Sequence, residues 1–392
     1  MKGNRPTLLH LQHINQTYSL VMTSSSLTKP HFALLDGLRG VAALIVLTYH
    51  LFEAWTTSAF DQMCNHGHLA VDFFFVLSGF VVAYAYDDRR RTLSVGAFVR
   101  RRLIRLHPMV VAGAVVGLLT FVLQGAVTWA GQGVGAGQMV LSLLMALLML
   151  PCLPGMPCEV RGNGEMFPLN GPTWSLFFEY VANVGYVLCL RRLRLRHLVL
   201  LALASGIALA WVVVGQTGSL GLGWTAADGG WWMGLLRVTF PFTMGQILAR
   251  LLPMVQRLRP IRGAFWLCAA LLVAFIAVPH VGGEKMPWLN GLYEMACVTL
   301  LFPAVVCMGA VGRTTDAFST RLCDVVGQIS YPLYAIHYPV LYLYFAWIWQ
   351  NNYTLADVWP VSLGLFIALP TVAYAVWRWY DLPVRRRLSR RG

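Results

Sequence analysis

Charged residues are scarce in this sequence of 392 residues. Asp, Glu, Lys and Arg together make up 12% of it, whereas soluble proteins carry about 25%. This scarcity, with 57% hydrophobic residues and a mean hydropathy of +0.61, excludes an ordinary soluble globular protein. Apolar runs near 20 residues recur along the chain, and the short alternating segments typical of a membrane barrel are missing. We therefore predict an all-α, polytopic membrane protein.

Closely paired cysteines are also missing. Eight cysteines are scattered through the chain, and none has the spacing of a metal site, so we predict no bound metal. Most of them fall within apolar runs, where a thiol is a small packing residue. Cys64, Cys152 and Cys158 fall in predicted loops on the outer side of the membrane, where a disulfide is an alternative.

Acidic residues are few: 16 stand against 30 basic residues, which gives a net charge of +14. In a membrane protein such an excess reflects arginine in cytoplasmic loops, so we predict no nucleic-acid partner. No apolar run in residues 1–30 is long enough for a signal peptide. We predict a flexible cytoplasmic tail there, with Met22 as an alternative start. A transmembrane domain at 31–384 and a basic cytoplasmic tail at 385–392 follow.

Arginine clusters determine the predicted topology. By the positive-inside rule, the arginine-rich loop 87–105 and the cluster at 191–196 are cytoplasmic. Both clusters stay on that side only if the short apolar run 139–151 is re-entrant or interfacial. The result is about ten spanning helices, with both termini cytoplasmic and Pro108 in the first turn of its span. The predicted spans lie at about 35–55, 69–86, 106–124, 173–190, 198–214, 232–250, 263–280, 290–311, 323–348 and 359–379.

Ionisable side chains recur in the predicted outer half of the membrane. Such groups are costly in lipid, so we expect them to line one polar cavity. His50 is the central candidate, because it lies eleven residues after Arg39, about 16 Å along a helix and half a bilayer core deep. Nearby aromatic residues suit a sugar, which presents hydroxyls and an apolar ring face. The ionisable residues are His50, Asp72, Glu179, Arg237, Glu294 and His337, and the aromatic residues are Trp174, Tyr331 and Tyr334.

The predicted cytoplasmic face carries arginines suited to an anion. Arg102 and Arg105 are three residues apart on a helix and therefore share a face, and Arg39 lies at the same depth. Arginine binds phosphate with two parallel hydrogen bonds, although arginines are expected in any cytoplasmic loop. Asp36 either pairs with Arg39 or caps the helix. An ion pair between Glu179 and Arg237 is an equal alternative to a substrate role.

Several segments resemble the membrane acyltransferase-3 family, whose bacterial members transfer acyl groups to hydroxyls of polysaccharides, antibiotics and similar acceptors. The similarity extends along nearly the whole chain, and its strength lies in several motifs in the same order. Asp381 precedes the last helix's proline, where the family more often has Glu. The matching segments are Arg39 with His50, Val71–Phe80, Arg102–Pro108, Pro172–Glu179, Arg237 with Phe242 and Gly245, and Ile329–His337.

The resemblance implies an O-acyltransferase of the bacterial inner membrane with no bound cofactor. Its donor would be cytoplasmic acyl-CoA, usually acetyl-CoA, and its acceptor a hydroxyl of a glycan or glycolipid. We predict that Arg39, Arg102 and Arg105 hold the CoA phosphates, with Arg39 and Asp36 also contributing to catalysis. The predicted acceptor-binding residues are Asp72, Trp174, Arg237, Tyr334 and His337.

His50 has two predicted roles. As a general base it would activate the acceptor hydroxyl, with Glu179 or Asp72 orienting the imidazole or the acceptor. Alternatively, His50 would carry the acyl group covalently. Two other classes of protein remain alternatives: a transporter of a glycan precursor, and a receptor or assembly partner without chemistry. The sequence carries no signal for the oligomeric state.

Overall fold

The computed structural model describes residues 31–58, 60–89, 91–257, 259, 261–314 and 316–390. The predicted tail at 1–30 lies outside the described residues. Within the described part the chain is helical, and its extended pairing is limited to two isolated bridges, Val127 with Gly133 and Glu165 with Thr225. The prediction of an all-α protein is confirmed for this part.

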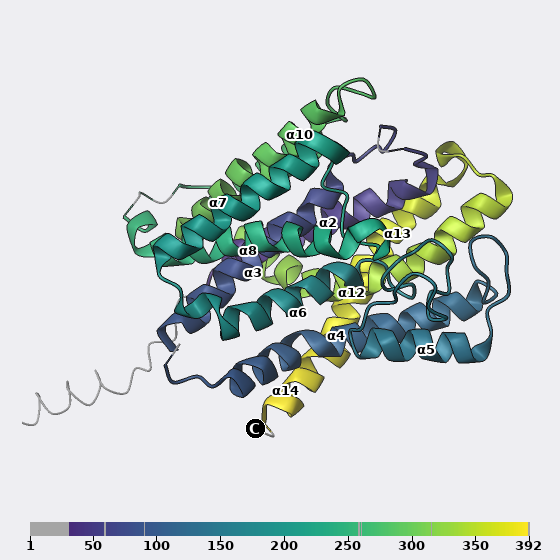
Figure 1. Ribbon diagram of the computed structural model, residues 1–392, viewed down its shortest axis with the longest axis horizontal. Coiled ribbons are helices and arrows are strands. Elements are labelled where there is room, and N and C mark those ends of the chain that lie inside the picture. The colour runs from purple at the N-terminus through teal and green to yellow at the C-terminus, as the bar shows by residue number, and fades with distance from the viewer. Residues whose placement is uncertain are drawn as a thin grey trace, which may run out of the picture. The chain divides into compact units, whose positions relative to one another are not determined.

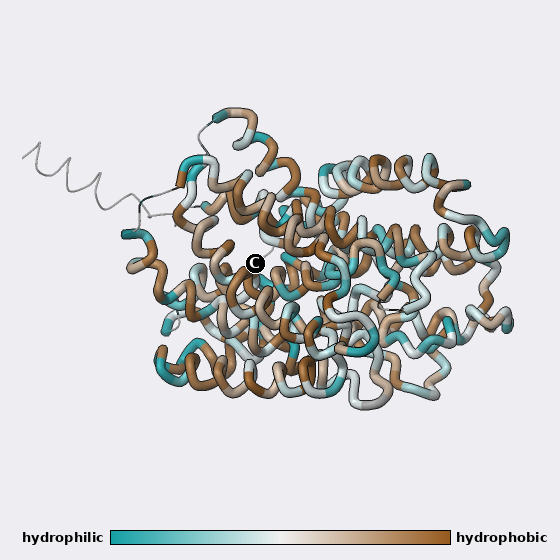
Figure 2. The backbone as a smooth tube through the Cα atoms, turned by 90° about the horizontal axis from the view of Figure 1, so that it is seen from above, coloured by the Kyte–Doolittle hydropathy of each residue, from teal (hydrophilic) through white to brown (hydrophobic). Residues whose placement is uncertain are grey.

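Helices occupy all ten of the predicted spans (Figure 1). In the described chain, seven helical segments are long and apolar enough to cross a membrane; α6 and α9 are shorter, and α12 is longer but rich in polar and tyrosine residues. Figure 2 shows the apolar residues following the helices, with hydrophilic residues gathered towards loops and helix ends. The helices are α2 (Ala33–Phe52), α3 (Ala70–Tyr86), α4 (Val95–Leu123), α6 (Thr173–Leu188), α7 (Leu195–Val212), α8 (Gly230–Val255), α9 (Ala264–Ile276), α10 (Pro287–Ala296), α11 (Phe302–Val311), α12 (Ala317–Asn351) and α13 (Leu355–Val376).

Two further α-helices complete the set in the described residues. The run predicted to be interfacial forms α5 (Ala136–Leu147), whose 12 residues are too few for an upright span. The basic C-terminal segment forms α14 (Leu382–Arg390), which packs against α4.

The prediction that Pro108 lies in the first turn of its helix is wrong. Helix α4 begins at Val95, where the Ser94 hydroxyl caps it by accepting a hydrogen bond from the Ala97 amide at 3.2 Å. Pro108 is therefore inside the helix, where it removes a backbone hydrogen bond. The hydroxyls of Tyr331 and Tyr380 donate to the carbonyls of Leu106 and Pro108, which supplies partners for backbone oxygens in this turn.

Close helix contacts position the elements that carry the candidate site. Helix α2 packs mainly against α12, and α3 packs mainly against α8. At these contacts the backbones approach so closely that only glycine fits. A β-carbon on Gly40 would overlap the carbonyl of Val326, and one on Gly79 would overlap the carbonyl of Phe242. Small residues allow this approach in membrane bundles, where dispersion contacts drive association.

The contact at Gly79 predicts a loss of stability on substitution. A Gly79→Ala variant should unfold about 1–3 kcal/mol more readily, because its methyl group overpacks the α3–α8 contact. Thermal unfolding of the purified protein in detergent measures this effect. Gly185→Ala is the matched control, because Gly185 is helical and has open space around its β-position. Equal melting temperatures for the two variants would contradict the role of Gly79.

Candidate active site: two cavities that meet at Tyr334

A cavity of about 260 Å³, here called the histidine cavity, lies at the C-terminal end of α2. Its wall combines a few polar groups with many aromatic rings, the usual composition of a small-molecule site. Its polar lining is Tyr49, His50, Glu53, His68, Asn163, Glu165 and Arg237. Its aromatic lining is Trp129, Trp174, Trp224, Tyr334, Tyr338, Tyr342, Phe345 and Trp349.

His50 lines this cavity with a carboxylate as its partner. The Nδ1 atom of His50 lies 2.7 Å from Oε2 of Glu53, and their side chains are 16% and 35% exposed, so both can be reached from the cavity. The Tyr338 hydroxyl donates to Glu53 at 3.3 Å, and the Tyr338 ring packs edge-on to His50 at 4.5 Å. An ionised carboxylate only accepts hydrogen bonds, so Nδ1 carries the proton and Nε2 is the basic nitrogen. This arrangement suits a general base.

The predictions that Glu179 or Asp72 orients His50 are wrong for this structure, because Glu53 occupies that position. The sequence does contain a signal for this pair. His50 and Glu53 are three residues apart where α2 runs into a short 3₁₀ turn, and residues at that spacing lie on one helical face. The prediction overlooked Glu53 because that residue falls at the loop end of the span.

Helix α12 supplies an aromatic stripe to the histidine cavity. Its members recur every three or four residues, which places them on one face of the helix. His337 lies beside this stripe but is 1% exposed and does not line the cavity. Its Nδ1 lies 3.0 Å from the carbonyls of Leu333 and Tyr334, and its ring lies 5.4 Å from that of His50. The stripe consists of Tyr334, Tyr338, Tyr342, Phe345 and Trp349.

A second cavity of about 130 Å³, here called the arginine cavity, is lined by Arg39, Arg102 and Arg105. The prediction that these three residues lie together is confirmed. Arg39 is held in place by an ion pair with Asp36 at 2.9 Å and by donation to the Ser330 hydroxyl at 2.9 Å. These contacts orient the guanidinium group of Arg39 towards the cavity wall formed by α12.

Glu179 lies in the arginine cavity and not in the histidine cavity. Its Oε1 atom accepts hydrogen bonds from Arg102 at 2.8 Å and from the Ser78 hydroxyl at 2.7 Å. Within the described residues, the Nε atom of Arg102 is buried without a hydrogen-bond partner. The Arg102 side chain is 14% exposed and lines the arginine cavity, and the donors that Glu179 does not use leave capacity to bind an anion.

Arg237 pairs with Asp72, so the alternative of a Glu179–Arg237 ion pair is wrong. Nε and Nη2 of Arg237 contact the Asp72 carboxylate at 2.6–3.2 Å, Nη2 also donates to the His68 carbonyl, and Nη1 donates to the Leu222 carbonyl, both at 3.0 Å. Arg237 reaches the histidine cavity, whereas Asp72 is fully buried behind it. Asp72 therefore anchors Arg237 at the cavity wall.

The prediction of one cavity for all six ionisable groups is also wrong. His50 and Arg237 line the histidine cavity and Glu179 lines the arginine cavity, while the other three line neither. Glu294 is buried and accepts hydrogen bonds from Ser219, from Asn290 and from the Leu220 amide. These bonds give Glu294 a structural role in fastening the segment around Ser219.

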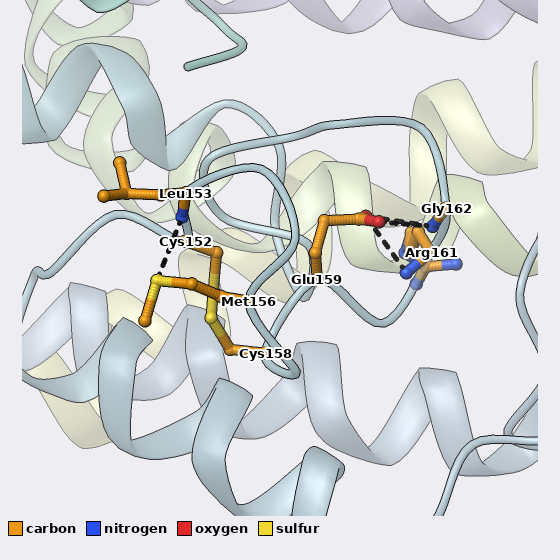
Figure 3. Close-up of a disulfide and its surroundings, with 7 residues drawn as sticks. All are labelled: Cys152, Leu153, Met156, Cys158, Glu159, Arg161 and Gly162. Carbon is orange, nitrogen blue, oxygen red and sulfur yellow. Dashed lines mark hydrogen bonds between the residues drawn. A yellow bond between two sulfur atoms is a disulfide. The ribbon is translucent and has the colours of Figure 1, made fainter. Parts of the chain in front are cut away.

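The loop at residues 148–172 closes one side of the histidine cavity. Figure 3 shows its disulfide between Cys152 and Cys158, which confirms one of the pairings considered for the outer loops. Further along, the guanidinium group of Arg161 is fully buried and stacks on the Tyr342 ring at 3.4 Å. Burial lowers the pKa of Arg161, and the nearby Tyr342 and Glu165 oppose this shift. The stacking of Arg161 on Tyr342 fixes the loop to α12.

Glu165 was not predicted as a site residue, and the structure places it in the cavity wall. It is 5% exposed, and its carboxylate accepts hydrogen bonds from Tyr342 and from Asn163. Burial raises the pKa of Glu165 to about 7, although Arg161 and these hydrogen bonds act in the opposite direction. The sequence offered no periodicity that would place a carboxylate of this irregular loop beside α12.

Val71 and Tyr334 line both cavities, so the two cavities meet at these side chains. The Tyr334 hydroxyl is within 2.6 Å of the Ser175 hydroxyl and donates to the Pro172 carbonyl at 3.2 Å. Trp174, between those two residues in sequence, lines the histidine cavity as predicted. The predicted aromatic residue Tyr331 instead lines the arginine cavity. The site therefore has an arginine-lined part and an aromatic part with a shared wall.

Comparisons with known proteins identify the family of this chain. The sequence profile of an acyltransferase domain matches residues 32–378. The acyltransferase MdmB of Streptomyces mycarofaciens is 26% identical over 370 residues, which is 87% of each chain. Protein 2 of the picA locus of Rhizobium radiobacter is 33% identical over 186 residues, which is 45% of this chain and 92% of that protein.

A more local similarity links the chain to a longer protein. A Staphylococcus aureus protein described as an O-acetyltransferase is 39% identical over 95 residues, or 23% of this chain and 14% of that protein. No solved structure gives a significant match. Since the acyltransferase profile spans most of the chain, with apolar helices throughout, this multi-pass membrane protein belongs to the acyltransferase-3 family.

Proposed function

We propose that this enzyme transfers an acyl group, most often acetyl, from cytoplasmic acyl-CoA to a hydroxyl of a glycan or glycolipid at the inner membrane of a bacterium. The contact between His50 and Glu53 is the observation that supports this function best. It places a basic nitrogen in an aromatic cavity that shares Val71 and Tyr334 with an arginine-lined cavity. The first cavity suits a sugar and the second suits the phosphates of CoA.

The chemical step assigns one proton transfer to His50. Nε2 accepts the proton of the acceptor hydroxyl while the oxygen attacks the thioester carbonyl. The carbon–sulfur bond breaks as the new ester bond forms, and the CoA thiolate leaves and takes the proton from the imidazolium. Glu53 holds Nδ1–H and stabilises the transient positive charge on the ring. His50 therefore ends the reaction in its starting state.

The covalent alternative differs in its first step. Nε2 would attack the thioester and release the CoA thiolate; the acceptor oxygen would then attack the acyl carbon, the bond from Nε2 to that carbon would break, and the hydroxyl would lose a proton to solvent that balances the one taken up by the thiolate. Incubation with radiolabelled acetyl-CoA alone, with rapid acid quenching and peptide mapping, distinguishes the two routes. Direct transfer predicts no label on the peptide that contains His50, and a labelled His50 would contradict it.

The donor site predicts a selective effect of Arg102. Replacement by Gln should raise the KM for acetyl-CoA by about tenfold or more, because a charged hydrogen bond to phosphate is lost. Steady-state release of CoA by the purified protein measures this change. Arg101→Gln is the matched control, since Arg101 is exposed on the same helix and does not line the arginine cavity. An unchanged KM in the Arg102 variant would argue against phosphate binding there.

A direct test of the proposed function uses the organism's own glycans. Membranes that contain the protein are supplied with radiolabelled acetyl-CoA, and label in the glycan fraction is measured before and after mild alkali, which cleaves O-acyl esters. Alkali-labile label that depends on the protein is the expected result. Label that stays in the acyl-CoA pool under these conditions would contradict acyl transfer.

A further inference from the structure

A second carboxylate in the histidine cavity has no part in the chemical step. Glu165 lines the cavity that contains the His50–Glu53 pair, and it reaches the wall from a loop and not from a helix. Burial of a carboxylate is costly, so such a group either fastens the fold or serves a ligand. The contacts of its loop decide between these two roles.

The loop is fastened without the Glu165 carboxylate. Before Glu165, the disulfide closes the segment Cys152–Cys158, and Figure 3 shows the Glu159 carboxylate accepting hydrogen bonds from the backbone of Arg161 and Gly162. The Arg161 side chain donates to the Pro168 carbonyl at 2.7 Å and to the Gln124 side chain at 2.8 Å. The backbone itself pairs between Met166 and Trp224 at 3.0 Å.

The Glu165 carboxylate retains capacity for a ligand. Above its pKa of about 7 the group is an ionised carboxylate with about four acceptor positions, and the hydrogen bonds from Tyr342 and Asn163 use two of them. Both partners hold the group in one orientation at the cavity wall. The two remaining positions can accept hydrogen bonds from adjacent hydroxyls of one molecule.

The size and lining of the cavity restrict that molecule. Pockets for drug-sized ligands measure about 300–1,000 Å³, so a cavity of about 260 Å³ suits one sugar ring better than an oligosaccharide. Tyr338 and Tyr342 lie side by side with their rings 4.7 Å apart, and they donate to Glu53 and Glu165 respectively. The aromatic stripe of α12 thus runs from the carboxylate that serves His50 to Glu165.

We propose that Glu165 is an acceptor-positioning residue, and that the histidine cavity binds a single pyranose ring, with hydroxyls hydrogen-bonded to Glu165 and its reacting hydroxyl at His50. The ring packs against the aromatic stripe of α12. This inference rests on the proposed acyl transfer and adds to it the size of the acceptor unit and the residue that selects it. Glu165 binds and orients the acceptor sugar, and His50 takes the proton of the reacting hydroxyl.

The test uses four probe acceptors: the methyl β-pyranosides of glucose, galactose, mannose and N-acetylglucosamine. Purified protein receives each probe with radiolabelled acetyl-CoA, and the KM values for probe and donor are measured separately. Wild-type protein should acetylate at least one probe. At pH 8, above the pKa of about 7 of Glu165, Glu165→Gln should raise the KM for that probe by about tenfold or more, because hydrogen bonds to a charged group are lost. The KM for acetyl-CoA should stay within about twofold.

Two further variants separate this role from a structural one. Glu159→Gln removes a carboxylate that holds the same loop but does not line the cavity, and its KM for the probe should stay within about twofold. Tyr342→Phe removes the hydroxyl that orients Glu165 and should raise the KM for the probe even if Glu165→Gln fails to fold. Equal losses for donor and probe, or an unchanged KM for the probe in both cavity variants, would overturn the proposal.

The remaining outcomes separate this inference from the proposed function. If no probe is acetylated while acetyl-CoA turnover still depends on His50, the single-pyranose site is rejected and acyl transfer stands. If acetyl-CoA turnover does not depend on His50, the proposed function itself is rejected.

Discussion

A His50→Gln variant should lose acyl transfer by about 10²–10⁴-fold, which is the usual contribution of a positioned general base. Glutamine keeps a polar side chain of similar length but has no basic nitrogen to accept the proton of the hydroxyl. Transfer of radiolabel from acetyl-CoA to glycan, at equal amounts of folded protein, measures this loss. A variant that retains wild-type transfer would remove His50 from the mechanism.

Glu53→Gln is the informative companion to this variant. It keeps the shape of the side chain but removes the charge that holds Nδ1–H of His50. We expect a smaller loss than for His50→Gln, because Nε2 persists while its orientation and the charge stabilisation weaken. A transporter or a receptor without chemistry would show no loss of transfer in either variant. Parallel losses in both variants therefore also argue against those two classes of protein.

An Asp72→Asn variant should lose about 3–5 kcal/mol of stability, because it leaves the guanidinium group of Arg237 buried without its counter-charge. Asp72 is fully buried and Arg237 is 1% exposed, so water would compensate little for the lost partner. The pair also joins α3 to α8, and Arg237 additionally holds the carbonyls of His68 and Leu222. Chemical or thermal unfolding in detergent measures the difference from wild type.

The ion pair between Asp87 and Arg250 provides the matched control. Asp87 follows the last residue of α3 and Arg250 lies in α8, and Nε of Arg250 is 2.7 Å from Oδ2 of Asp87. The Asp87 and Arg250 side chains are 21% and 16% exposed, so water and ions screen the remaining charge. Asp87→Asn should therefore cost clearly less than Asp72→Asn. Equal costs would show that burial of the Asp72–Arg237 pair does not determine its contribution.

Local signals in the sequence were sufficient for one half of the candidate site. Arg102 and Arg105 fall on one face of a helix, and Arg39 lies near the start of an apolar helix at the same predicted depth, so their meeting in the arginine cavity was predictable. The same holds for the ion pair of Asp36 with Arg39, which lie one helical turn apart. In each case the helical repeat relates neighbouring residues directly.

Partners of buried charges could not be predicted in this way. Depth in the membrane placed Asp72, Glu179 and Arg237 together, but depth does not specify the direction in which a side chain points. The rotation of each helix about its axis and its packing partner determine that direction. The α3–α8 contact therefore pairs Arg237 with Asp72, and the approach of α4 to α6 pairs Arg102 with Glu179.

The sequence by itself determined the all-α membrane class, the approximate positions of the helices and the family motifs, and it identified His50 as the candidate catalytic residue. The class and the helices follow from composition and from short-range periodicity, whereas the family follows from the resemblance of several motifs in order. The tertiary structure alone decided that the candidate residues are divided between the histidine cavity and the arginine cavity, that Glu53 contacts His50, and that Glu165 lines the histidine cavity. The physical reason is that a cavity is bounded by elements far apart in sequence. The irregular loop that carries Glu165 has no repeat from which its place beside α12 follows.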